Sequence, residues 1–243
     1  MISVCVATYN GEKYIKQQLL SILSQLTLTD EVIVSDDGST DNTCSIIESL
    51  NDYRIRLYHN DFHSCRLNFQ FAMQQAQGDI IFLSDQDDVW LENKVKLCMK
   101  ELEHYDLVVT NSYETNETLD IVNKSFFNKY HSGRGILKNI FCNTYYGSCM
   151  VFKRDLLSDA LPLPETKEIG HDLWLGLVAE MNGKKVLFMQ EPLLLYRRHS
   201  QTATTTTSLL KRSNRNLITK IWSRVIIIYN VLKYMLNNGK RTR

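Results

Sequence analysis

The sequence predicts an α/β fold in which a mostly parallel sheet is flanked by helices. Over the first hundred residues, short apolar runs rich in β-branched side chains alternate with segments whose apolar residues recur at helical spacing. Strand–helix alternation at this spacing is typical of parallel strands joined by right-handed crossovers. The chain has 243 residues, 44% of them apolar and 23% charged, which is the composition of an ordinary globular protein with a full core.

Each element of this first part has its own signal. Residues 2–7 form a β-branched apolar run, as in a buried strand, and the segment that follows carries Ile15, Leu19 and Ile22 on one helical face. The same pair of signals then repeats along the chain. The expected strands are residues 2–7, 31–35, 54–59, 79–84 and 106–112, and the expected helices are 11–26, 39–50 with Ser39 or Asp41 as N-cap, 65–77 and 91–104.

The alternation weakens after residue 112. Residues 115–125 are polar and are expected to form a loop, whereas 143–157 resemble a strand, a turn and the start of a helix. Residues 171–183 predict a short helix that ends at Gly183, and 184–199 predict an extended apolar segment.

Charge is unevenly distributed, and this suggests an anionic partner for the C-terminus. Residues 1–191 contain 17 Lys and Arg against 27 Asp and Glu, whereas residues 192–243 contain 11 Lys and Arg and no acidic residue. The six cysteines show no CxxC motif and no zinc-ligand spacing, which favours reduced thiols in a cytosolic compartment. We expect no signal peptide, and the most apolar segment, 225–236, is too short to span a bilayer.

Polar residues follow three of the expected strands. The first strand ends in "ATYNG", the second in "SDDGS" and the fourth in "SDQDD". Each could be a plain turn, because Asp, Asn, Gly and Ser are common turn residues. Ligands of open α/β sheets bind beyond the carboxyl ends of the strands, so three such ends at one edge predict a ligand site.

The fourth strand end carries the most specific chemistry. Asp85 and Asp87 flank one residue, so a turn can aim both carboxylates at a single point. The pair is tolerable if a divalent cation neutralises it, and Mg²⁺ and Mn²⁺ are often held by one or two carboxylates together with substrate phosphates. The alternative is that Asp87 or Asp88 simply caps the helix expected at 91–104.

Together, "ATYNG", "VSDDGSTDNT" and "GDIIFLSDQDDVW" resemble the family 2 glycosyltransferases of the GT-A fold, which has a Rossmann-like sheet. The resemblance covers residues 2–112 and resumes at 171–199, and the "DQDDVW" wording is common in bacterial enzymes that build O-antigen, capsule and related surface polysaccharides. It implies an inverting transferase that uses a nucleotide-diphosphate sugar and Mn²⁺ or Mg²⁺. UDP-hexose and dTDP-rhamnose both fit a pocket that reads a pyrimidine.

The resemblance also implies roles for residues at the strand ends. Asp37 would accept a hydrogen bond from N3–H of uracil or thymine, and Asp87 would bind the metal. Asp85 would lie toward the ribose or the metal. The implied nucleotide-sugar-binding residues are Thr8, Tyr9, Asp36, Asp37, Asp85 and Arg197, and the implied metal ligands are Asp85, Asp87 and His199.

In the second part of the chain, the resemblance implies a catalytic base. "GHDLW" matches the family's acidic motif at the start of a helix, with Asp172 as the base and His171 where Glu is commoner. "YRRHSQT" matches a segment in which some members place a metal-binding His and diphosphate-binding basic residues, here His199 and Arg197. The alternatives are that Asp172 is an N-cap and that His199 is a solvated side chain.

The expected organisation follows from these matches. Residues 1–112 form the nucleotide-sugar-binding half, 113–200 the acceptor-binding half, 201–208 a low-complexity linker, and 209–243 a basic helical tail. The tail is amphipathic, with Trp222 on its apolar side, and can lie in a membrane interface on the inner face of the plasma membrane. The alternative is a helix docked on the catalytic domain or on a partner. The implied acceptor is a saccharide, suited to a polyprenyl-diphosphate carrier, and no nucleic-acid partner is expected.

Two other functions compete with sugar transfer. A sugar-phosphate nucleotidyltransferase also pairs an α/β sheet with metal-binding carboxylates, but "VATYNGEKY" lacks the Gly-rich basic loop that such an enzyme needs. The second alternative, a non-catalytic nucleotide-sugar-binding protein, is disfavoured by the intact carboxylates at the expected site.

Overall fold

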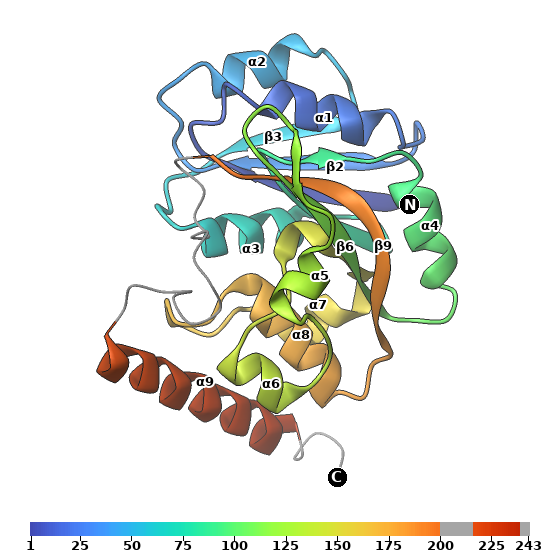
Figure 1. Ribbon diagram of the computed structural model, residues 1–243. Coiled ribbons are helices and arrows are strands. Elements are labelled where there is room, and N and C mark those ends of the chain that lie inside the picture. The colour runs from blue at the N-terminus through green and yellow to red at the C-terminus, as the bar shows by residue number, and fades with distance from the viewer. Residues whose placement is uncertain (200–215, 239–243) are drawn as a thin grey trace.

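A nine-stranded mixed sheet forms the centre of the computed structural model, which describes residues 1–199 and 216–238 (Figure 1). The strand order is β3-β2-β1-β4-β8-β6-β9-β5, and β7 pairs with β6. The strands are β1 Ile2–Thr8, β2 Glu31–Asp36, β3 Ile55–His59, β4 Ile80–Asp85, β5 Val89–Trp90, β6 Leu107–Thr115, β7 Ile121–Asn123, β8 Met150–Lys153 and β9 Val186–Arg197. The expected linker at 201–208 and the first residues of the expected tail lie outside the described ranges.

Helices cover both faces of the sheet. Figure 1 shows α1 and α2 on one side, and α3, α7 and α8 on the other, with α6 and α9 beyond α8. The helices are α1 Ile15–Leu23, α2 Thr43–Ser49, α3 Cys65–Gln75, α4 Lys94–Glu101, α5 Phe126–Tyr130, α6 Ile136–Phe141, α7 Asp155–Ala160, α8 His171–Met181 and α9 Leu217–Asn238, with a 3₁₀ turn, η1, at Gly147–Cys149. The predicted α/β class with flanking helices is therefore confirmed.

The first four strands of the sheet are parallel, as the alternating sequence predicts. β1 is buried along its whole length and pairs with β2 on one side and β4 on the other. In this register Thr8 lies beside Asp36, and Ala7 beside Asp85. The polar residues that end β1, β2 and β4 therefore meet at one edge of the sheet.

The second part of the sheet departs from the predicted parallel series. The strand expected at 106–112, now β6, does not follow β4, because the antiparallel β8 lies between them. The parallel neighbour of β6 is β9. Within the segment expected to be a loop, 115–125, residues 121–123 form β7, which folds back on β6 as a hairpin. The helix expected at 171–183 is confirmed as α8, and Gly183, just beyond it, has φ +68°.

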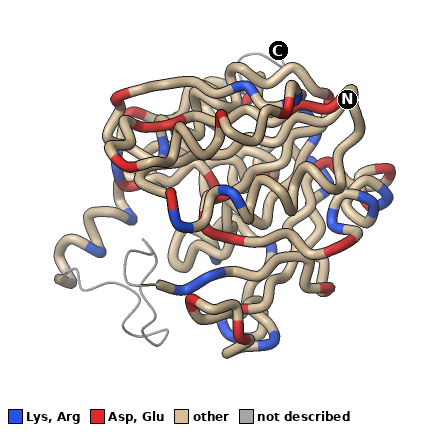
Figure 2. Tube along the Cα trace, turned by 90° about the horizontal axis from the view of Figure 1, so that it is seen from above, with Lys and Arg blue, Asp and Glu red and all other residues tan. Residues whose placement is uncertain are grey.

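The helix expected in the C-terminal tail is present as α9 and packs on the protein through a narrow edge. Ser223, Ile227 and Val231 are buried in this contact, and the ring of Tyr234 meets Trp174 with their centroids 5.6 Å apart. α9 carries basic residues and no acidic ones. In contrast, Figure 2 shows acidic residues spread over the body of the protein. Among the described residues, no helix is long and apolar enough to cross a membrane.

Candidate active site

A cavity of about 740 Å³ opens at the carboxyl edge of β1, β2 and β4. The start of α8 and the residues just after β9 also reach it, so segments far apart in the sequence share its walls. Of the residues that the sequence singles out, the cavity is lined by Thr8, Tyr9, Asp37, Asp85, Asp87, His171, Asp172 and His199.

Three carboxylates gather at the end of β4. Ligand oxygens of Asp85, Asp87 and Asp88 lie within 4.8 Å of one another. Burial, and then the charges of Asp87 and Asp172, raise the pKa of Asp85 to about 7. Burial, followed by the charges of Asp87 and Asp85, raises the pKa of Asp88 well above its ordinary value. Because these carboxylates repel one another, a bound cation would stabilise the cluster.

The donor set fits a hard divalent cation. The imidazole Nε2 of His199 lies 2.7 Å from Oδ2 of Asp87, and both side chains are largely buried. Oδ2 of Asp88 is buried and has no hydrogen-bond partner among the described residues. Carboxylate oxygens with one imidazole suit Mg²⁺ or Mn²⁺, so the residues present can hold the implied ion.

The alternative that Asp87 or Asp88 caps the following helix is wrong. α4 begins at Lys94, and its N-cap is Asn93, whereas Asp87 and Asp88 precede the short strand β5. The backbone N–H of Arg197 donates to Oδ1 of Asp88, at 3.1 Å. This hydrogen bond joins the carboxylate turn, residues 85–88, to the end of β9.

Gln86, which is not among the residues expected at the site, clamps the ends of β1 and β4 together through hydrogen bonds. Its Oε1 accepts hydrogen bonds from the hydroxyl of Thr8 and the backbone N–H of Tyr9, and its Nε2 donates to the carbonyl of Tyr9. The Tyr9 side chain stays 52% exposed at the rim of the cavity. The sequence shows a glutamine between the two carboxylates, but it does not show which backbone groups this side chain contacts.

Asp36 and Asp37 have separate places. The carboxylate of Asp37 lines the cavity and accepts three backbone hydrogen bonds, from Phe62, His63 and Ser64. Asp36 does not line the cavity, and its oxygens accept hydrogen bonds from the backbone N–H and the hydroxyl of Ser39. The sequence therefore places Asp37 correctly at the cavity, whereas Asp36 stabilises the turn that follows β2.

Asp172 lies in the first turn of α8 and faces the same cavity as the strand-end carboxylates. The N-cap of α8 is Gly170, so the capping alternative for Asp172 is wrong. Its Oδ1 accepts a hydrogen bond from the backbone N–H of Leu173 at 2.7 Å, and its Oδ2 accepts one from Nδ2 of Asn143 at 3.3 Å. These two donors orient a carboxylate that has no basic partner within hydrogen-bond distance among the described residues.

His171 packs beside this carboxylate as a neutral ring. It is 9% exposed, and its imidazole stacks on Phe69 with ring centroids 4.1 Å apart. Burial, with a smaller contribution from Arg66, lowers the pKa of His171 despite the charge of Asp172. The position at which the family commonly has Glu is therefore uncharged here at neutral pH.

The structure does not bring Arg197 into the cavity. Its Nε donates to the carbonyl of Asp87 at 2.7 Å, and its two terminal nitrogens donate to the carbonyl of Glu117 and to Oε1 of Gln17. Its guanidinium also lies 4.7 Å from the ring centre of Tyr14. Arg197 therefore stabilises the backbone of the carboxylate turn from outside the cavity. This role differs from the diphosphate contact expected from the sequence.

The fold and the cavity together define a class of protein. A sheet with the order β3-β2-β1-β4, carboxylates at the end of β4 and an acidic residue opening a helix across the cavity are the features expected of a GT-A glycosyltransferase. The model of the family described as "Glycosyl transferase family 2" matches residues 3–161, which is more than half of the chain. The chain belongs to this family.

Several bacterial transferases are similar in sequence. The glucosyltransferase WfgD of Escherichia coli, whose name gives a UDP-Glc donor and an α-D-GlcNAc-diphosphoundecaprenol acceptor, is 27% identical over 186 residues, which are 75% of this chain and 71% of WfgD. The dTDP-rhamnosyl transferase RfbG of Shigella flexneri is 37% identical over 99 residues, 37% of this chain and 34% of RfbG. The glycosyltransferase GlyG of Streptococcus pneumoniae is 31% identical over 123 residues, and the chain spans 41% of its length.

Solved structures share the fold. TarS 1–349 of S. aureus in complex with UDP-GlcNAc superposes with a TM-score of 0.68 at 19% identity, covering 98% of this chain and 74% of that one. The mannosyltransferase PcManGT of Pyrobaculum calidifontis, solved with GDP-Man and Mn²⁺, gives a TM-score of 0.63 at 18% identity, covering 82% of this chain and 57% of that one. At these identities the likeness extends to the fold alone.

Proposed function

We propose that the protein transfers a sugar, with inversion, from a UDP- or dTDP-sugar to a saccharide acceptor on a lipid diphosphate, in the synthesis of a bacterial surface polysaccharide. The observation that carries the proposal is that Asp172 faces the carboxylates at the end of β4 across one cavity. The named donors and acceptor of WfgD and RfbG support the choice of substrates.

The positions of Asp172 and the strand-end carboxylates support a single displacement as the reaction. The acceptor hydroxyl attacks the anomeric carbon, and the new C–O bond forms as the bond to the diphosphate breaks, by analogy with inverting glycosidases. The hydroxyl proton passes to the carboxylate of Asp172, which Asn143 and the start of α8 hold in position. A general base placed in this way contributes about 10²–10⁴-fold to the rate.

The donor diphosphate belongs at the other side of the cavity. Asp85, Asp87 and His199 would hold Mn²⁺ or Mg²⁺ there, and the ion, when bound, supplies positive charge to the leaving diphosphate. The Asp37 carboxylate and the Gln86 clamp fix the walls against which a pyrimidine nucleotide would lie.

Replacement of Asp172 tests this function. Asp172→Asn keeps the size of the side chain and its bond from the Leu173 N–H, so the melting temperature and the donor affinity should stay close to those of the wild type. Turnover should fall by about 10²–10⁴-fold, because the amide cannot accept the proton. Release of UDP or dTDP, with and without Mn²⁺, from UDP-hexoses and dTDP-rhamnose gives the readout. Near-normal turnover of Asp172→Asn would refute the base, and no turnover of any donor by the wild type would favour a binding protein.

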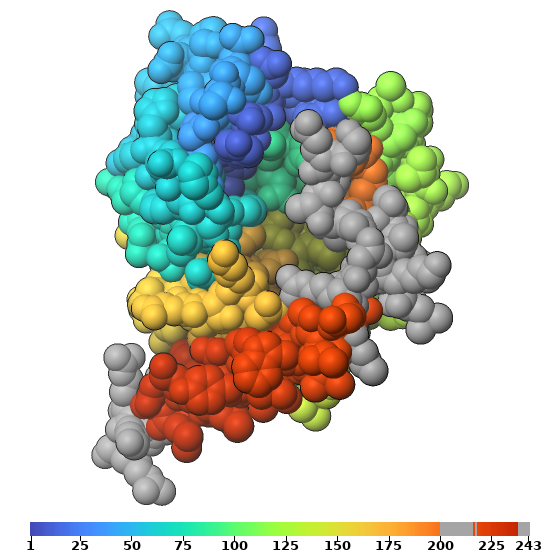
Figure 3. All heavy atoms as spheres, turned by 90° about the vertical axis from the view of Figure 1, so that its left-hand side faces the viewer, coloured from blue at the N-terminus to red at the C-terminus, as the bar shows by residue number. Residues whose placement is uncertain are grey.

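The membrane is the partner we propose for the outer face of α9. The large apolar side chains of this face are exposed, Trp222 by 63% and Ile218 by 78%, and α6 adds exposed Leu137 and Phe141 beside them. Figure 3 shows α9 as a ridge along the edge of the molecule. Among the side chains of α9 that the structure describes, the exposed apolar residues are Ile218, Ile221, Trp222, Val225, Ile228, Tyr229, Leu232, Met235 and Leu236.

Charge favours lipid over a protein partner. Residues 209–243 contain no Asp or Glu, and each basic residue near an anionic leaflet contributes about 1 kcal/mol of attraction. The wild type should sediment with vesicles that contain anionic lipid, and more weakly with zwitterionic ones. Ile221→Ser/Trp222→Ser should lose this binding, whereas Leu28→Ser, at an exposed apolar residue remote in sequence, should not. Equal sedimentation of all three proteins, or a stable dimer that α9 holds together, would overturn the membrane assignment.

A further inference from the structure

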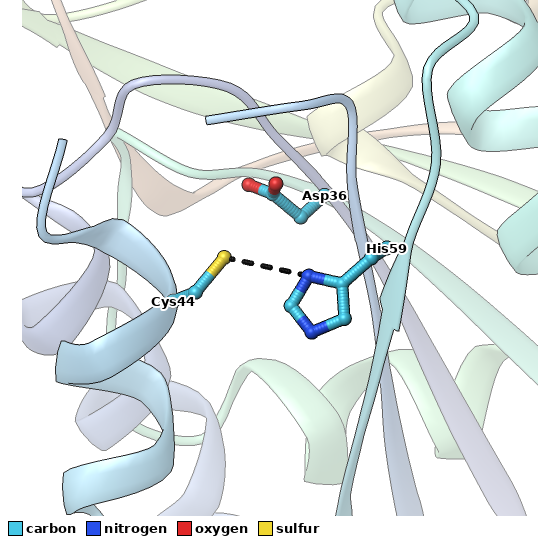
Figure 4. Close-up of side chains that lie close together, drawn as sticks. All are labelled: Asp36, Cys44 and His59. Atoms are coloured by element: carbon cyan, nitrogen blue, oxygen red, sulfur yellow. Dashed lines mark hydrogen bonds between the residues drawn. The ribbon is translucent and has the colours of Figure 1, made fainter. Parts of the chain in front are cut away.

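A second cluster of metal-ligating side chains lies at the carboxyl ends of β2 and β3, outside the cavity. Asp36 ends β2, His59 ends β3, and Cys44 lies in the first turn of α2. Figure 4 shows the Cys44 thiol and the His59 imidazole facing each other, with the Asp36 carboxylate close to both. One ligand atom from each lies within 4.8 Å of the other two.

The geometry of the cluster fits a tetrahedral ion. The Sγ of Cys44 and the Nδ1 of His59 are 3.8 Å apart. A zinc ion with bonds of about 2.3 Å to sulfur and about 2.0 Å to nitrogen holds the two ligand atoms roughly 3.5 Å apart at a tetrahedral angle, so a shift of a few tenths of an ångström brings Cys44 and His59 to that separation. The backbone already fixes the strand residues, because Asp36 and His59 are register partners in adjacent strands.

The donor chemistry selects the type of cation. A thiolate and an imidazole favour Zn²⁺ and similar thiophilic ions over Mg²⁺ or Mn²⁺, which prefer oxygen. One carboxylate and one thiolate balance the charge of a divalent cation, with the imidazole neutral. Asp36 is buried, Cys44 is half-buried and His59 is exposed, so the cluster opens to solvent on the side of His59, where water can be the fourth ligand.

We propose that Asp36, Cys44 and His59 form a binding site for a thiophilic divalent cation of the zinc type, separate from the oxygen-rich cluster at the end of β4. A bound ion would join β2, β3 and α2. The adjacent residue, Asp37, holds the backbone of the 62–64 loop at the cavity wall. The ion would therefore stabilise the wall of the cavity without entering it.

The competing description is a hydrogen-bonded cluster with no room for an ion. Burial, and then the charge of Asp36, raise the pKa of the Cys44 thiol to about 11, so without an ion the thiol keeps its proton at neutral pH. That proton can be donated to the Asp36 carboxylate or to the imidazole of His59. Binding of a cation must displace it, and the two descriptions therefore differ in whether a thiolate forms.

Cobalt distinguishes the two descriptions, since a thiolate bound to Co²⁺ gives a near-ultraviolet charge-transfer band that an oxygen site does not. The reduced full-length protein, titrated with Co²⁺ in excess Mg²⁺, should develop this band at one equivalent, and Zn²⁺ should remove it. Cys44→Ser and His59→Gln should each lose the band. Cys142→Ser, at another half-buried thiol, should keep it.

Thermal stability gives a second readout, because a ligand that binds only the folded state raises the melting temperature. Zn²⁺ should raise the melting temperature of the wild type and of Cys142→Ser, and leave that of Cys44→Ser unchanged. A wild-type protein without a thiolate band at saturating Co²⁺, or a band that survives Cys44→Ser, would overturn the proposal. Neither result depends on sugar transfer. Failure of the proposed cation site can therefore be distinguished from failure of the proposed function.

Discussion

A single methyl group added at Gly147 should disturb the wall of the cavity that carries Asp172. A Cβ at Gly147 would lie 2.6 Å from Nε2 of His171. The imidazole cannot swing aside freely, because it is buried and stacks on Phe69 with a centroid distance of 4.1 Å. Either η1 or the start of α8 must therefore move.

The size of the effect follows from that distance. Non-bonded heavy atoms sit at about 3.5–4.0 Å, so Gly147→Ala forces a displacement on the order of 1 Å. Overpacking of this kind costs about 1–3 kcal/mol, which for a chain of this size lowers the melting temperature by roughly 2–12 °C. Asp172 is the next residue after His171, and a misplacement of about 1 Å in a catalytic group can reduce turnover by about 10²-fold.

Calorimetry and donor turnover of four proteins test this reasoning. They are the wild type, Gly147→Ala, His171→Ala and the double variant. Removing the imidazole removes the clash, so the second substitution should cost much less stability in the Gly147→Ala background than alone, a coupling of about 1 kcal/mol or more. Gly133→Ala is the control, since its Cβ would meet only the flexible Nζ of Lys138, at 3.0 Å. If Gly147→Ala melts and turns over like the wild type, or if the losses simply add, the steric argument is wrong.

Three further predictions concern single substitutions elsewhere in the protein. Asp87→Asn should weaken Mn²⁺ binding at least tenfold by calorimetry, yet melt no lower than the wild type without metal, because it removes one of three mutually repelling carboxylates. Glu114→Gln should cost about 3 kcal/mol in urea unfolding at pH 7, because it removes the negative charge beside the buried guanidinium of Arg198. Burial would raise the pKa of Glu114, but hydrogen bonds from its basic partners hold it below its ordinary value. The stability that Glu114 contributes is therefore present above pH ~4.5 and is lost as the pH falls through the lowered pKa. In acid, the unfolding free energies of Glu114→Gln and the wild type should converge. Gln86→Leu should raise the donor KM more than it lowers kcat, because the backbone of Tyr9 loses both of its bonds to the amide, and an unchanged KM would show that the clamp is dispensable.

The sequence predicts one part of the site well, for a physical reason. Parallel strands with helical crossovers bring their carboxyl ends to one edge, so residues that follow β1, β2 and β4 meet whatever their distance along the chain. Asp37, Asp85 and Asp87 reach the cavity as predicted. Asp172 could be located only through the family resemblance, because no local periodicity shows that the start of α8 faces those strand ends.

Residues that act through distant backbone partners escaped prediction. Arg197 was expected at the cavity because the resembling segment of the family carries diphosphate-binding basic residues, but its nitrogens donate to groups on three other segments of the chain. The position of β8 beside β4 was missed for a similar reason. A four-residue strand that pairs about seventy residues from its partner leaves no periodic signal of which neighbour it joins.

For α9, the amphipathic pattern of the sequence correctly predicts a helix but does not determine which face of that helix is buried. An amphipathic helix ordinarily turns its apolar stripe toward the core, which would have favoured docking on the catalytic domain. Instead, a narrow edge with Ser223, Ile227 and Val231 is buried, and the broad apolar face points outward. Because exposing that face is costly in water, the contacts of α9 with the protein do not explain its composition, and this supports the apolar partner that we propose for it. The same surface carries no acidic residue, and the anionic lipid interface that we propose would match both properties of the helix.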